Sequence, residues 1–97
     1  MRLPTAKEIF EDMKTILREK RKRGRYLWFY SKSYDLFDFV SKDFFPKSNK
    51  TELELWLNKI KPELQKMVNH PLFNIVVDGL VTNEPQGLRY EITIAIL

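Results

Sequence analysis

The chain has 97 residues, of which 43% are hydrophobic and 31% are charged, and its formal net charge is +4. This length predicts a single domain (residues 1–97) with one modest core, and the composition excludes a disordered chain. The absence of cysteine excludes a disulfide framework and fits a reducing, cytoplasmic location. No apolar run approaches the roughly 18 residues that span a bilayer, so we expect no membrane partner.

Residues 5–23 are predicted to form the first helix. Thr5 and Glu8 have the spacing of a capping box, and an apolar stripe at helical spacing follows: Ile9, Phe10, Met13, Ile16 and Leu17. The cations at 20–23 would lie in the last turn, where they favour the helix dipole, and Gly24 suits a left-handed cap. The short aromatic stretch 25–30 (RYLWFY) then predicts a buried strand.

Two further helices are predicted before residue 71. Ser33 is a suitable N-cap for the second, which Pro46 ends, and its inner face would be Leu36, Phe37, Val40 and Phe44. The third would begin near Asn49 and continue to His70, with this apolar stripe: Leu53, Trp56, Leu57, Ile60, Leu64, Met67 and Val68. Pro62 predicts either a kink or two shorter helices.

The last 26 residues change to the period-two pattern of strands. Leu88, Tyr90, Ile92, Ile94 and Ile96 share one face of a strand, and the segment 83–87 (NEPQG) is the turn that precedes it. The strand before that turn shifts its apolar phase by one residue at Asp78-Gly79. We interpret this shift as a β-bulge, with an Asp-Gly hairpin turn as the alternative.

The residue types required by common catalytic sites do not occur together. His70 is the only histidine, so a His/Cys metal site is excluded, and its place at a helix end suggests a capping residue. Asp78 and Glu91 lack the lysine and third acid that nuclease chemistry requires. With three glycines in the chain, no phosphate-cradling loop is present. We therefore predict no cofactor, no metal and no enzymatic activity.

The positive charge is concentrated in residues 18–25 (REKRKRGR), which contain six cations and one glutamate. A solvated helix end is one interpretation of this tract, a phosphate-binding patch is the second, and a site for an acidic protein is the third. In the second, phosphates are neutralised by Arg18, Lys20, Arg21, Lys22, Arg23 and Arg25.

The expected order, helix–strand–helix–helix–strand–strand, resembles that of the winged-helix superfamily over nearly the whole chain. The resemblance implies an α+β fold of three helices packed on a small antiparallel sheet that ends in a C-terminal β-hairpin. It also implies a DNA-binding regulator whose third helix enters the major groove. By position, the implied contacts are Ser31, Lys32, Ser33, Lys50, Thr51, Glu54, Asn58, Lys61, Gln86 and Arg89.

A protein-interaction module such as an adaptor, inhibitor or dimerisation domain is the rival hypothesis. Nine of the 13 aromatic residues lie between Tyr26 and Phe45, and we expect most of them in the core. Some would be left for a partner surface, the candidates being Tyr26, Trp28, Tyr30, Tyr34, Phe39 and Phe45. The C-terminal strand (EITIAIL) could also pair edge to edge with a second copy, which would give a homodimer.

Overall fold

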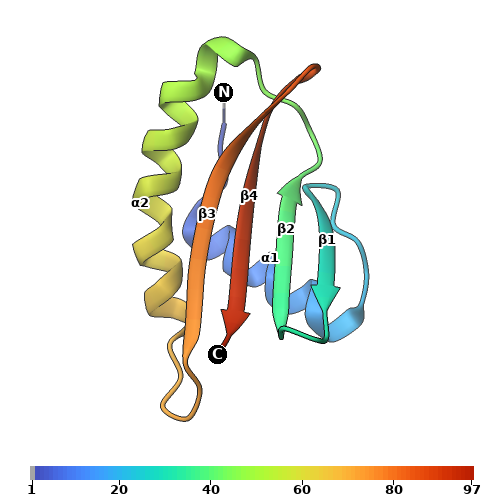
Figure 1. Ribbon diagram of the computed structural model, residues 1–97, viewed down its shortest axis with the longest axis vertical. Helices are drawn as coiled ribbons and strands as arrows, with labels where there is room; N and C mark the ends of the chain where they lie inside the picture. The colour runs from blue at the N-terminus through green and yellow to red at the C-terminus, as the bar shows by residue number, and fades with distance from the viewer. Residues whose placement is uncertain (1) are drawn as a thin grey trace.

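The computed structural model describes residues 2–97, which form two helices and one four-stranded antiparallel sheet (Figure 1). In chain order the elements are α1 (Ala6–Glu19), β1 (Tyr26–Ser31), β2 (Leu36–Ser41), the single 3-10 turn η1 (Lys47–Asn49), α2 (Lys50–Val68), β3 (Ile75–Glu84) and β4 (Gly87–Ile96). The strand order in the sheet is β1-β2-β4-β3. The α+β class and the C-terminal hairpin are confirmed, whereas the expectation of three helices is wrong.

Helix α1 begins as the sequence predicts and ends earlier. The Thr5 hydroxyl accepts a hydrogen bond from the Glu8 N–H at 3.1 Å, and the Glu8 carboxylate accepts one from the Thr5 N–H, which completes the capping box. Lys20 adopts the left-handed conformation (φ 54°) that ends the helix. Residues 20–25 therefore form a loop, and Gly24 is not the cap that the sequence suggested.

The predicted second helix is instead strand β2. The turn 32–35 reverses the chain, with Asp35 in the left-handed region (φ 45°), and β1 and β2 pair as an antiparallel hairpin from Tyr26↔Ser41 to Ser31↔Leu36. Phe37 and Phe39 point to the helices and Asp38 to the other side. The same residues fit both helical and alternating spacing because the segment is short. The observed order is helix–strand–strand–helix–strand–strand, so the order that suggested a winged helix does not occur.

Helix α2 runs without interruption through Pro62, so the alternative of two shorter helices does not occur. Its buried residues are Leu53, Leu57, Ile60 and Leu64. Leu57 packs directly on β3 at Gly79, where a Cβ atom would lie 2.9 Å from the Leu57 Cδ1 atom. Glycine at this position lets the helix approach the strand closely.

Strands β3 and β4 pair continuously from Ile75↔Ile96 to Glu84↔Gly87, and the turn lies at 85–86. Neither a bulge nor a hairpin turn forms at Asp78-Gly79. The shift in the apolar pattern does not interrupt the strand. It places Leu80 on the side of the sheet that faces away from the helices, where it is 49% exposed.

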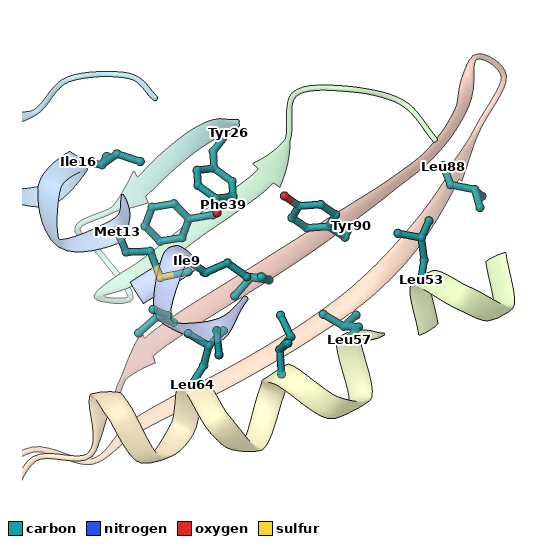
Figure 2. Close-up of a cluster of buried hydrophobic side chains, with 14 residues drawn as sticks. Ile9, Met13, Ile16, Tyr26, Phe39, Leu53, Leu57, Leu64, Leu88 and Tyr90 are labelled. Atoms are coloured by element: carbon teal, nitrogen blue, oxygen red, sulfur yellow. The ribbon is translucent and has the colours of Figure 1, made fainter. Parts of the chain in front are cut away.

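The core lies between the helices and one face of the sheet (Figure 2). Tyr26, Phe39 and Tyr90 are each at most 1% exposed, and the Tyr26 ring meets the other two edge-on at centroid separations of 6.1 and 6.5 Å. The expectation that most aromatic residues of 26–45 lie in the core holds only in part. Two of the nine are buried, three are partly buried against the core, and four are exposed: Phe29, Tyr30, Tyr34 and Phe44.

The two free edges of the sheet are β1 and β3. Strand β4 lies between β2 and β3, so the predicted edge-to-edge pairing through the C-terminal strand is wrong. On β3, Gln65 of α2 takes the place of a neighbouring strand: its Nε2 donates to the Ile75 carbonyl at 2.7 Å, and its Oε1 accepts from the Val77 N–H at 2.9 Å.

The close approach of α2 to β3 gives a stability prediction. Gly79→Ala should lower the free energy of unfolding by about 1–3 kcal/mol, because the new methyl group overlaps Leu57 and the Glu91 carbonyl oxygen. Gly24→Ala is the matched control, since nothing lies within 4 Å of its Cβ position. It should leave stability unchanged or raise it by up to about 1 kcal/mol. Urea unfolding compares the two, and equal midpoints would contradict the packing argument.

Candidate interaction surfaces

The basic loop consists of Lys20, Arg21, Lys22 and Arg23, and all four side chains are exposed. It joins the end of α1 to the start of β1 at the β1 margin of the molecule (Figure 1). Among residues 2–97, none of these four cations has a carboxylate partner within ion-pair distance. Their charge is therefore available to an external anion.

The other two cations of the tract are paired within the chain. Arg25 lies 3.4 Å from the Glu8 carboxylate and 3.4 Å from that of Asp12, and Arg18 lies 3.4 Å from Glu19. Burial lowers the pKa of Arg25, but the Tyr26 hydroxyl and the two carboxylates outweigh it and leave that pKa raised. These ion pairs connect Arg25, at the end of the loop, to α1. Four of the six cations in residues 18–25 therefore remain without a carboxylate partner among residues 2–97.

The remaining predicted contacts are not brought to the basic loop. Lys32 lies in the β1–β2 turn, whereas Lys50, Asn58 and Lys61 lie on α2, which packs against β3 at the opposite edge of the sheet. Arg89 lies on β4, where it is 3.4 Å from the Glu84 carboxylate and 4.0 Å from the centre of the Phe44 ring. These residues do not form one phosphate-binding surface.

The sheet has a second surface that the sequence did not reveal, here called the open face. Both helices pack on the other side of the sheet, and in Figure 1 α1 passes behind the strands. Alternation along the paired strands assigns these residues to the open face: Leu27, Phe29, Ser31, Leu36, Asp38, Val40, Val76, Asp78, Leu80, Thr82, Glu84, Arg89, Glu91, Thr93 and Ala95. Phe29 is 59% exposed there.

Carboxylates occupy the centre of the open face. Asp38 and Asp78 both pair in register with Thr93 of β4, and Glu91 is the next outward residue on that strand. The Thr93 hydroxyl donates a hydrogen bond to Asp38. Burial raises the pKa of Glu91, and the charge of Asp38 and a hydrogen bond to it add to the shift. Two carboxyl groups are thus held side by side among apolar neighbours.

The aromatic candidates divide between core and surface. Tyr26 and Phe39 are buried, and burial raises the pKa of Tyr26 well above its ordinary value. Trp28 and Phe45 are partly buried, and Tyr30 and Tyr34 are exposed. Phe29 was not among the sequence candidates, although its position between the inward Trp28 and Tyr30 would have assigned it to the outer face.

Histidine and carboxylate side chains are the candidate metal ligands of this cysteine-free chain. No group of three or more His, Asp or Glu side chains within 2–97 could hold a metal ion. His70 lies in the loop after α2, where its Nδ1 accepts a hydrogen bond from the Leu72 N–H, so it stabilises that loop and does not cap the helix. Over the same residues, neither helix is long and apolar enough to cross a membrane.

Comparison of the chain with protein-family models, with curated proteins and with solved structures finds no match. Function must therefore be argued from the surfaces of this chain alone.

The carboxyl pair makes stability depend on pH. The folded state raises the pKa of Glu91 above its ordinary value of 4.5, so folding takes up a proton at pH values between the two pKa values. The stability of the folded state therefore falls as the pH rises through that range. Glu91→Gln removes this cost. The variant should gain stability relative to the native chain between about pH 4 and about pH 7. Urea unfolding of the variant and of the native chain at both pH values measures the difference in their free energies of unfolding. A difference that does not change with pH would contradict the contribution of the Glu91 pKa shift.

Proposed function

We propose that the protein is an interaction module whose open face binds a segment of another protein that presents an arginine or lysine among apolar side chains. The observation that carries the proposal is the pair Asp38 and Glu91 at the centre of an uncovered sheet face. Phe29 pairs in register with Asp38, and Leu80 with Glu91. They are 59% and 49% exposed, and Val76, which is 39% exposed, lies further along β3 on the same face. Exposed apolar patches of this kind characterise partner surfaces.

The energetics of the open face support a cationic partner. Covering a large apolar side chain fully contributes about 1.5–3 kcal/mol, so half-exposed residues on this face leave substantial stabilisation for a partner. A guanidinium group placed between the two carboxyl groups would relieve their repulsion and satisfy their oxygens at the same time. Arg89 of the chain itself does not fill this role, because it pairs with Glu84.

The same charges make two other occupants less suitable. A second copy placed face to face would bring its own carboxylates against these, which costs free energy at neutral pH. Nucleic acid would bring phosphates against Asp38, Asp78 and Glu91. A partner that carries positive charge avoids both penalties.

Selection from a displayed library of random peptides on the immobilised protein tests the proposal. The selected peptides should share an arginine or lysine flanked by apolar residues, because the acidic centre and its apolar surround both require a match. Glu91→Lys should weaken their binding at least about tenfold, since it reverses the charge at the contact. Fluorescence polarisation measures the Kd.

A pair of serine variants supplies the control. Leu80→Ser removes an apolar side chain from the open face without adding charge, and Leu55→Ser does the same on α2, where Leu55 is 66% exposed. The first should weaken peptide binding and the second should not. Peptides without a cation, or equal losses in the two variants, would overturn the assignment of this face.

A second candidate function is binding of a nucleic acid through the basic loop. Four exposed cations without a carboxylate partner among residues 2–97 support it. Flexible cationic loops can contact phosphates of single strands without reading sequence. This activity would use a different surface from the open face, so the two functions are separable.

Salt dependence tests this second candidate. If all four cations contact phosphates, log affinity for single-stranded DNA should fall with log salt with a slope of about −3. Replacing Lys20, Arg21, Lys22 and Arg23 by alanine should abolish that slope. Replacing Lys50, Lys59, Lys61 and Lys66 of α2 removes the same charge at another site and should leave it unchanged. If the two quadruple variants lowered DNA affinity equally, DNA would be attracted only by the net charge of the protein, and the basic loop would not be a specific site.

A further inference from the structure

An apolar cavity of about 310 Å³ opens between the C-terminal halves of the two helices, at the end of the sheet. Phe10, Met13 and Leu17 of α1 form one wall, Met67 of α2 forms another, and Phe37 and Ile94 of the sheet form the floor. It lies on the helix side of the sheet, so it is distinct from the open face. Its volume is at the lower end of the range for ligand sites in proteins.

The cavity walls consist mainly of apolar side chains, and some of these side chains remain partly exposed to water. Leu17 and Met67 are each 38% exposed, although both belong to the apolar stripes that pack the core. An apolar group inserted here would remove these side chains from water.

Two basic side chains, Lys14 and His70, and the amide side chain of Asn69 lie among the lining residues, and no carboxylate lies among them. Lys14 is 3.3 Å from Glu11, but both side chains are more than half exposed, so this surface ion pair holds the ammonium group weakly. The His70 Nδ1 accepts a hydrogen bond from the Leu72 N–H, which leaves the Nε2–H of the neutral ring as a donor. Both groups can therefore interact with an anion.

We propose that this cavity binds a small amphipathic anion, with its apolar tail between α1 and α2 and its carboxylate or sulfonate head against Lys14 and His70. The apolar walls favour an apolar tail, and Lys14 and His70 favour a head group with negative charge. The volume limits the tail to a short or medium-length chain.

Titration with linear carboxylates of increasing length tests the site, using hexanoate, octanoate and decanoate below their micelle concentrations. Each added methylene should lower the Kd about fourfold until the cavity is full, which corresponds to about 0.8 kcal/mol per group. Decylamine should bind more weakly than decanoate. Amide chemical shifts should change at the lining residues of α1, α2 and β4 and not on the open face.

Charge reversal on α1 separates a specific head-group contact from general attraction. Lys14→Glu should weaken decanoate binding at least about tenfold and reverse the preference over decylamine. Lys7→Glu is the control, because Lys7 is exposed, lies two turns earlier on the same helix face and does not line the cavity. Equal effects of the two variants, no dependence on tail length, or shift changes elsewhere in the protein would each overturn the proposal.

Discussion

The register of β2 against β4 connects the core to the open face. Phe39 pairs with Ile92, and both are fully buried beneath the helices. Because side chains alternate along a strand, burial of these two residues forces Asp38 and Glu91 to the opposite side. A slip of one residue would bring carboxylates into the core and expose the aromatic ring. The hydrophobic core therefore fixes not only the fold but also the position of the acidic pair.

The two free edges of the sheet are protected in different ways. At β3, α2 packs close to the strand at Gly79, and Gln65 binds the backbone of Ile75 and Val77. Among residues 2–97, no comparable side-chain cover of β1 is seen, but the basic loop lies at this margin of the molecule. Positive charges beside an exposed edge repel a second copy of the same chain. The loop thus opposes edge-to-edge association whether or not it also contacts an anion.

The sequence was informative where a pattern extended over several turns and ambiguous where it was short. The structure confirms the capping box of Thr5 and Glu8, the long apolar stripe of α2 and the turn within residues 83–87. The prediction of a helix over 36–45 was wrong because Leu36, Phe37, Val40 and Phe44 fit helical spacing, while Phe37 and Phe39 also fit the alternation of a strand. That error hid the open face, since Asp38 and Val40 can be recognised as outward residues only once β2 is known to be a strand. The pairing of Arg25 with Glu8 and Asp12 was equally hidden, because it joins segments that are distant in sequence.

The acidic pair is difficult to explain by stability alone. Asp38 and Glu91 repel one another in a half-buried setting, and the shift in the Glu91 pKa records a cost to the folded state at neutral pH. A threonine or lysine at position 91 would remove that cost without disturbing the core, since the side chain points away from the helices. Local features that oppose stability and touch no core residue are concentrated at binding sites. Protonation of Glu91 offsets this cost at low pH, and a cation placed between the two carboxyl groups would offset it at neutral pH. Within the described chain, Arg89 is committed to Glu84. The acidic pair therefore supports the proposal that a partner supplies a cation to this face.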